Sequence, residues 1–555
     1  MALTRGERLS SLVEGEPMFE PSGRSLRRSV LVGFLTATVA CGQPSAPPAP
    51  AEPASVPSSP SSDEASPLER IRPAFAEVDR LFNSFAERSH APGMAWGVLL
   101  DGQLVHTGSA GFREVESRSP IGTDTVFRIA SMTKSFTALS ILKLRDEGRL
   151  SLDDPAERYV PELRGLAYAT ADSPKITIRH LLSHSEGFPE DNPWGDRQLA
   201  RTDAEMSEMM RRGIPFSTAP GTAYEYSNFG FAILGRIVAN VSGQPYTTYV
   251  SENILQPLGL DSTTLQAAEV PADRLAHGYR WQDDAWIDEP PLPDGAFGPM
   301  GGMLTSTTDL GRYVGFLMNA WPPRDDPETG PVRRASVREM QQVWRPGLAT
   351  VRLGADGSVQ LSAGGYGFGL AVRQTCEFGQ VVSHTGGLPG YGSVMTWLPE
   401  YGLGVIGMVN LTYTSARAAA NEAVLRLVKT AGLEPRQPMP SPALLEARDS
   451  VNRLLVNWDD ELAESIAADN LFLDQSMDRR RGTIEALGQE HGACRPDEEF
   501  DVENALRGQW TMNCDRGAML VAITLAPTMP PKVQHLSVRS IEPGAATRPP
   551  ACGPF

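Results

Sequence analysis

The chain has 555 residues, a formal net charge of −17 at pH 7 and a pI of about 5.1. Its length favours two to four domains, and its 41% of apolar residues is enough for at least one large core. The acidic balance argues against a nucleic-acid-binding protein, because phosphate binding needs a basic face. We therefore expect no nucleic acid among the partners.

Residues 1–41 have the pattern of an export signal. Three arginines precede an apolar run over 30–40, which is too short to cross a bilayer as a helix but fits the core of a signal peptide. The run ends in small residues followed by Cys41, which resembles a bacterial lipobox. We expect Cys41 to become a lipidated N-terminus that tethers an exported protein to the periplasmic or cell-surface side of a bacterial membrane. The alternative is an ordinary signal peptide in which Cys41 has no role.

Residues 42–67 are rich in Pro, Ser and Ala, which predicts a semi-extended linker. Residues 68–432 have the pattern of one mixed domain, with apolar residues at helical spacing or in alternation. We expect helices over 68–88, 131–147, 231–241 and 421–431, and strands over 94–100, 103–112, 380–384, 392–398 and 403–410. This order favours an α+β fold in which helices pack on an antiparallel sheet.

Residues 433–442 contain several prolines and predict a second linker. Residues 443–555 then read as a small α+β domain, with helices expected over 444–457 and 461–468 and strands over 509–514, 518–526 and 532–538. Cys494 and Cys514 lie in this domain, and an oxidising compartment would favour a disulfide between them. No motif in the domain indicates its role.

The segment from Ser131 to Lys134, at the start of a predicted helix, suits nucleophilic catalysis. A serine hydroxyl is a weak nucleophile until a base removes its proton. Positions three apart share one face of a helix, so the Lys134 amine can reach the Ser131 hydroxyl. A lysine acts as a base only where burial or a nearby cation lowers its pKa. Ser-x-x-Lys also occurs by chance, so this pattern alone does not establish a site.

Two further segments have suitable chemistry. Tyr226 beside an ammonium can relay protons, and Asn228 can both donate to and accept from a substrate amide. The segment His384 to Gly387 follows the predicted strand 380–384, where glycines would let a substrate backbone lie against the strand edge. Each segment alone has a plain alternative, either turn residues in a loop or a structural histidine.

Together and in this order, the three segments resemble the motifs of the serine β-lactamase-related family. That family includes class C β-lactamases, D-alanyl-D-alanine carboxypeptidases, D-aminopeptidases and some esterases. The resemblance covers about 85–432 and extends to the segments 148–155, 176–184, 301–307 and 366–370. It implies a penicillin-binding-protein-like fold, in which an antiparallel sheet flanked by helices is joined to an all-helical subdomain, and a chemistry without a cofactor.

The resemblance implies that Ser131 attacks the substrate and becomes acylated, while Lys134 and Tyr226 share the proton transfers. It leaves open which of the two is the base. The expected activity is hydrolysis of an amide or ester in a small molecule or peptide, such as a D-alanyl peptide. A β-lactamase or a carboxylesterase is the alternative within the class. A membrane-tethered sensor that is acylated but turns over slowly is the alternative outside it.

The remaining motif residues would bind the substrate. By resemblance, Asn228 binds the substrate amide, and the backbone N–H groups of Ser131 and Gly387 form the oxyanion hole. Thr385 seats the carboxylate or carbonyl side of the substrate, and Gly386 belongs to the same segment.

One residue departs from the β-lactamase pattern, because His384 stands where those enzymes mostly have lysine. Histidine is mostly neutral near pH 7, which lowers our expectation of efficient hydrolysis of anionic β-lactams. His180 and His184 have a metal-ligand spacing, but no glutamate follows His180 and the family pattern explains the pair as structural. We therefore expect no metal.

Overall fold

The computed structural model describes residues 65–353 and 359–544. Cys41 and the rest of the predicted signal lie outside the described residues, as does most of the predicted linker 42–67. Within the described residues, no helix is both long enough and apolar enough to cross a membrane.

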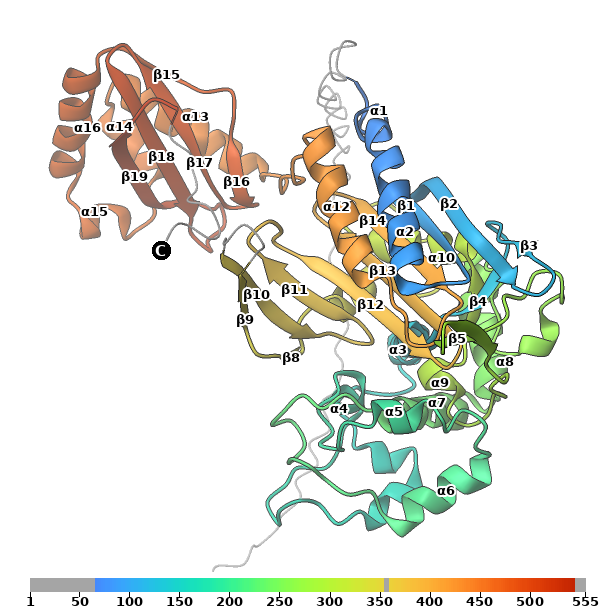
Figure 1. Ribbon diagram of the computed structural model, residues 1–555. Helices are drawn as coiled ribbons and strands as arrows, with labels where there is room; N and C mark the ends of the chain where they lie inside the picture. Colours follow the sequence, from blue (N-terminus) through green and yellow to red (C-terminus); the bar gives the residue numbers. More distant parts are fainter. Residues whose placement is uncertain (1–64, 354–358, 545–555) are drawn as a thin grey trace, which may run out of the picture. The chain divides into compact units, whose positions relative to one another are not determined.

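The larger sheet in the described residues is antiparallel and belongs to the larger domain (Figure 1). In the described residues its strand order is β3-β2-β1-β14-β13-β12-β11-β10-β8, and β9 pairs with β10. The strands are β1 (Gly93–Leu100), β2 (Gln103–Glu114), β3 (Ser119–Pro120), β8 (Arg345–Pro346), β9 (Thr350–Leu353), β10 (Val359–Tyr366), β11 (Ala371–Thr375), β12 (Val381–Leu388), β13 (Tyr391–Leu398) and β14 (Leu403–Val409). β1 and β2 meet at Asp101 and Gly102, which both have positive φ, as a tight hairpin turn requires.

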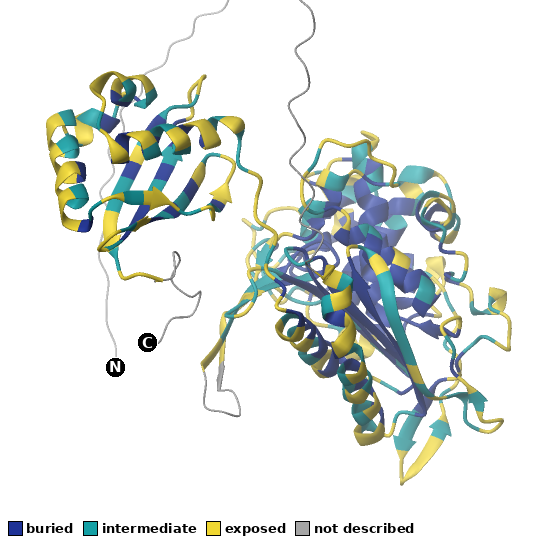
Figure 2. Cartoon of the chain, turned by 90° about the horizontal axis from the view of Figure 1, so that it is seen from above, coloured by how far each residue is buried: buried dark blue, intermediate teal, exposed yellow. Residues whose placement is uncertain are grey.

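Helices cover both faces of this sheet. α2 (Phe75–Ser89) and α12 (Arg417–Ala431) lie side by side on one face, where Trp96 and Val98 of β1 join their core. α3 (Thr133–Asp146) and α10 (Thr307–Met318) belong to the core on the other face, which takes Ala95 and Leu99. Because successive strand residues point to opposite faces and helices cover both, β1 is buried along its whole length. Figure 2 shows the buried centre of the larger sheet in dark blue.

The first predicted helix is divided in the structure. α1 (Pro67–Ile71) is followed by a 3₁₀ turn over Arg72–Ala74 before α2 begins. Pro73 explains the division, because proline has no backbone N–H to continue the ladder and its ring crowds the preceding turn.

A helical region lies beside the sheet and holds the second motif. It comprises α4 (Ile178–Leu182), α5 (Asn192–Gly195), α6 (Asp203–Arg212), α7 (Asn228–Ser242), α8 (Tyr246–Val250) and α9 (Gly298–Gly301). Short strands β4 (Val126–Arg128) and β7 (Leu304–Ser306) pair with each other, as do β5 (Tyr279–Gln282) and β6 (Ala285–Asp288). α7 packs against α3 and α9, so the first two motifs are held by one helical core.

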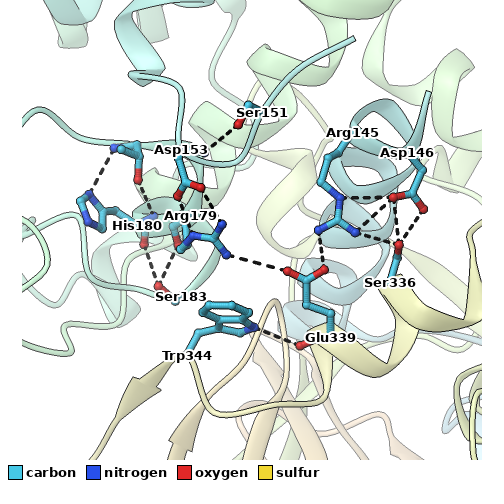
Figure 3. A network of polar contacts seen from close by, with 11 residues as sticks. Arg145, Asp146, Ser151, Asp153, Arg179, His180, Ser183, Ser336, Glu339 and Trp344 are labelled. Carbon is cyan, nitrogen blue, oxygen red and sulfur yellow. Dashed lines mark hydrogen bonds and ion pairs between the residues drawn. The ribbon is translucent and has the colours of Figure 1, made fainter. Parts of the chain in front are cut away.

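The C-terminal end of α3 is fixed by a polar network (Figure 3). Arg145 donates to Ser336 Oγ at 2.7 Å and pairs with Glu339, both on α11 (Arg334–Met340). Arg179 of α4 donates to both carboxylate oxygens of Asp153, at 2.7 and 2.9 Å, and also lies near Glu339. α3, α4 and α11 are thereby tied together at the end of α3 opposite Ser131.

The C-terminal domain has its own core, to which Leu444, Trp510 and Val521 belong. Its helices are α13 (Pro442–Val456), α14 (Asp460–Ile466), α15 (Leu471–Asp474) and α16 (Met477–His491), and its strands are β15 (Cys494–Pro496), β16 (Asp501–Asn504), β17 (Arg507–Cys514), β18 (Gly517–Leu525) and β19 (Val533–Ile541). The strand order is β15-β17-β18-β19, with β16 also paired to β17. Cys494 and Cys514 form a disulfide between β15 and β17.

Candidate active site

Ser131 lies in a 3₁₀ turn, Ala130–Met132, between β4 and α3. The sequence placed it in the first turn of the helix, whereas α3 begins at Thr133. Ala130 has a φ of 49°, in the left-handed region that alanine rarely adopts. The Thr133 hydroxyl donates to Ala130 O at 2.6 Å and accepts from Met303 N at 3.0 Å, which holds the turn in this conformation.

Lys134 is fully buried, and its amine contacts three oxygens. Nζ lies 3.1 Å from Ser131 Oγ, 2.6 Å from Asn228 Oδ1 and 2.8 Å from Met300 O. An ammonium has three hydrogens, so this set of acceptors satisfies it. The first and second motifs therefore meet at one lysine.

The pKa of Lys134 is lowered to about 7, mainly because burial disfavours the charged form. The carboxylates of Asp196 and Asp191 act in the opposite direction and raise it. A substantial fraction of the amine is therefore neutral at neutral pH, which a general base requires.

Tyr226 lies over the same lysine, with its ring centroid 4.8 Å from Lys134 Nζ. Burial raises the pKa of the Tyr226 phenol well above its usual value, an interaction with the Ser131 hydroxyl lowers it, and Tyr224 raises it further. The phenol consequently keeps its proton at neutral pH and suits the role of a donor better than that of a base.

Asn228 opens α7 and points its amide at Lys134. The Ser227 hydroxyl accepts from Gly230 N at 3.0 Å and caps the helix. Asn228 Nδ2 donates to Asn192 at 3.4 Å while Oδ1 accepts from Lys134, so its amide orientation is set by partners on both sides.

The third motif lies inside β12, not after it as the sequence suggested. β12 continues to Leu388, which pairs with Tyr391 of β13, so Thr385, Gly386 and Gly387 are strand residues. β11 pairs with β12 as far as Ser383, which leaves β13 as the one strand beside the motif in the described part of the chain. The free edge of these residues suits an extended substrate.

Gly386 brings β12 against the turn that holds Ser131. A Cβ on Gly386 would lie 2.1 Å from Ile129 O and 2.3 Å from Ser393 Oγ. Ser393 Oγ also donates to Ile129 O at 2.8 Å, so the strand and the turn are joined as well as closely packed. Only a residue without a side chain fits this contact.

His384 is held in one neutral tautomer. Its Nδ1 lies 2.7 Å from Thr385 O, which can only accept, so Nδ1 carries the hydrogen. Nε2 then accepts from the Tyr366 hydroxyl at 2.8 Å. Burial and the nearby Lys134 charge lower the pKa of His384 to about 3. The sequence assigns no role to Tyr366, because its contact with His384 depends on the pairing of β10 with β11 and of β11 with β12.

His180 lies in α4 and His184 follows this helix, and each accepts a hydrogen bond from a backbone N–H. His180 Nδ1 accepts from Thr177 N at 3.2 Å in a helix cap, and His184 Nδ1 accepts from Ser227 N at 3.1 Å. In the described residues, no cluster of three or more His, Cys, Asp or Glu side chains could hold a metal ion.

A cavity of about 810 Å³ lies over β10 and β11, and no residue of the three motifs lines it. Tyr366 and Tyr224 line it together with β10, β11 and the start of α12, including Arg417. Tyr366 also donates to His384, so this one side chain connects the wall of the cavity to the third motif. Sequence reasoning missed this cavity and also the carboxylates Asp191 and Asp196, whose charges act on Lys134.

Residues 78–429 match the Beta-lactamase family, so the chain belongs to that family. The fold is accordingly a β-lactamase/penicillin-binding-protein-like fold, with an additional C-terminal sheet domain. The chemistry of this family is of the serine hydrolase type.

Three relatives illustrate the similarity. Protein flp from Staphylococcus aureus (strain MW2) is 30% identical over 249 residues, covering 44% of this chain and 49% of the relative. Penicillin-binding protein 4* from Bacillus subtilis (strain 168) is 28% identical over 336 residues, covering 57% and 68%. The octameric penicillin-binding protein homologue from Pyrococcus abyssi has a TM-score of 0.55 at 22% identity, covering 81% of this chain and 96% of its own, and shows the fold. The chain spans about half the length of the first relative.

Proposed function

We propose that this protein is a serine hydrolase that cleaves an ester or amide through an acyl-Ser131 intermediate. The observation that carries the proposal is the 3.1 Å contact between Lys134 Nζ and Ser131 Oγ, at a lysine whose pKa burial lowers to about 7. A neutral amine at this distance can take the serine proton as the hydroxyl attacks a carbonyl carbon.

In the proposed cycle, Lys134 is the general base and Tyr226 is the proton donor. Lys134 accepts the hydroxyl proton, and the tetrahedral oxyanion is stabilised by the backbone N–H groups of Ser131 and Gly387. The Tyr226 phenol, which remains protonated, donates to the leaving group and is reprotonated from Lys134. Water then attacks the acyl-enzyme with the same groups, releasing the acid and restoring Ser131.

The substrate we favour is a peptide or amide with a D-amino-acid acyl donor, as for a D-alanyl carboxypeptidase. The free edge of β12 supports an extended peptide substrate, and one relative is a penicillin-binding protein by name. The neutral His384 supports a second candidate, a carboxylesterase, because the third motif offers no fixed positive charge to an anionic substrate.

From the sequence alone, we propose that the protein is exported, cleaved before Cys41 and attached to the membrane by a lipid on Cys41. If Cys41→Ser releases the protein from the membrane fraction, the anchor is supported. Equal membrane attachment of this variant would reject it.

The function is tested with a panel of neutral esters, D-amino-acid amides, D-alanyl-D-alanine peptides and β-lactams, each with wild type and Ser131→Ala. We expect steady turnover of at least one ester or D-peptide that Ser131→Ala lacks. A burst equal to the enzyme concentration without later turnover would instead support a slowly deacylating sensor. Equal rates for both proteins would reject Ser131 as the nucleophile.

A further inference from the structure

The turn of residues 191–195, which includes α5, closes around the second motif. Asp191 N donates to Tyr226 O at 3.3 Å. The Asp191 carboxylate accepts from Asn228 N at 2.6 Å through Oδ1 and from Phe229 N at 2.9 Å through Oδ2. The Ser227 hydroxyl adds a longer contact of 3.4 Å to Oδ2. One side chain thus satisfies two N–H groups of the first turn of α7, which have no partner within the helix.

The far end of the same turn packs on the Asn228 side chain. A Cβ on Gly195 would lie 2.5 Å from Asn228 Cβ and 2.6 Å from Nδ2, so the close approach requires a residue without a side chain. Gly195 N in turn donates to Asp191 O at 2.7 Å, which closes the turn on itself. The backbone N–H of Asn228 is therefore bound by Asp191, and its side-chain amide is in contact with the 192–195 segment.

We propose that residues 191–195 are a clamp that positions Asn228, and through it the Lys134 amine, relative to Ser131. Asp191 and Gly195 are its positioning residues. The link is direct, because Asn228 Oδ1 lies 2.6 Å from Lys134 Nζ and that amine lies 3.1 Å from Ser131 Oγ. The catalytic consequence of the clamp rests on the proposed function, whereas the clamp itself does not.

The two positioning residues act by different physical means. Asp191 contributes hydrogen bonds and also a negative charge that raises the pKa of Lys134. Gly195 acts only through its lack of a side chain, which leaves room for the side chain of Asn228. Asp191→Asn therefore removes the charge and weakens the cap, while Gly195→Ala displaces Asn228 without changing any charge. The other titratable groups around Lys134, which are Asp196, Tyr226, His184 and His384, are unchanged in both variants.

Hydrogen exchange of the full-length protein tests the clamp without any substrate. In Asp191→Asn we expect the amides of Asn228 and Phe229 to exchange at least about tenfold faster than in wild type. Asp309→Asn is the matched control, since Asp309 is a buried carboxylate that accepts from Ser262 N at 2.7 Å. Unchanged exchange at 228 and 229 in Asp191→Asn would overturn the clamp.

Ester kinetics test the effect of the clamp on catalysis. We expect both clamp variants to lose about tenfold to a hundredfold in kcat, the cost of misplacing a catalytic group by a fraction of an ångström to one ångström. The acid limb of the pH profile should move to lower pH in Asp191→Asn and stay in place in Gly195→Ala. A kcat loss no larger than that of Asp309→Asn would overturn the positioning role. A wild type without acyl-Ser131 would reject the proposed function, and hydrogen exchange would still decide the clamp.

Discussion

Burial of the Lys134 side chain has opposite consequences for stability and for catalysis. The amine titrates near 7 in the folded protein and near 10.4 when unfolded. Between these values the unfolded chain binds more protons, so this group makes the free energy of unfolding rise with pH across that window. The cost of the buried lysine is thus largest below pH 7, where the amine is charged.

The same pKa sets the pH dependence that we predict for catalysis. Because only the neutral amine accepts a proton, kcat/KM for a neutral ester should rise about tenfold per pH unit below 7 and level off above it. Lys134→Ala should lower kcat/KM by about 10²- to 10⁴-fold and remove this limb. A wild-type profile that shows no midpoint near 7 and is still rising in the alkaline range, as the raised pKa of Tyr226 requires, would point to Tyr226 as the base instead.

A second prediction concerns His384. The imidazole is neutral and occupied by Tyr366 and Thr385, so His384→Lys introduces a positive charge at the substrate-binding strand. A charge pair at about 4 Å and an effective dielectric of about 20 is worth roughly 4 kcal/mol before desolvation, which offsets much of it. We expect a gain of about tenfold in kcat/KM for an anionic β-lactam relative to a neutral ester.

The ratio of the two substrates is the readout for this variant, since a second lysine near Lys134 affects both substrates alike. If His384→Lys folds and slows both equally, the charge argument is wrong and His384 belongs to the proton relay. Tyr366→Phe is the companion variant, because it removes the partner of Nε2 without adding charge.

Among the contacts between elements, the one between β12 and the turn that holds Ser131 leaves no room for a side chain at Gly386. Gly386→Ala would place a methyl group 2.1 Å from Ile129 O, so strand and turn must separate. We expect a loss of about 1–3 kcal/mol in stability, typical of overpacking, and a clear fall in kcat. Gly165→Ala is the control, because a Cβ there has no heavy atom within 4 Å. Equal thermal shifts and rates in the two variants would show that the contact is not tight.

At this scale the sequence predicted the family and the sheet-and-helix fold, both of which are confirmed. Local pattern failed where the structure depends on partners distant in sequence. The strand expected over 380–384 continues through the third motif because β13 pairs with it to Leu388, and its glycines had suggested an end. Asp191 has no distinctive neighbours in sequence, and only the fold brings it to the N-terminus of α7.

In the candidate site, too, local sequence pattern identifies some features, and others depend on residues distant in sequence. The motifs named Ser131, Lys134, Tyr226 and Asn228, and the fold places Ser131 Oγ and Asn228 Oδ1 on the same amine. The neutral state of His384 follows from burial and from Tyr366, which no spacing rule predicts. Residue type thus indicates the chemistry, whereas pKa values and orientation arise from packing.

For the whole molecule, we predict that the C-terminal domain is dispensable for chemistry. A chain ending at Pro438 keeps Leu433, which belongs to the core of the larger domain, and Arg436, whose N–H donates to Glu400 O at 2.7 Å. It loses the last four residues of the predicted second linker, 439–442, and all that follows, including the separate core around Trp510. We expect ester hydrolysis within about twofold of the full chain. A folded truncated protein without activity would show that this domain contributes to the site.

The most direct test of the account is to identify the residue that becomes acylated. The full chain is treated with a fluorophosphonate or with a penicillin, digested and analysed by mass spectrometry. We predict a single modification, on the peptide containing Ser131, which is absent from Ser131→Ala and much slower to form in Lys134→Ala. Modification of a different serine, or none on a folded wild-type protein, would contradict the assignment of Ser131 as the nucleophile.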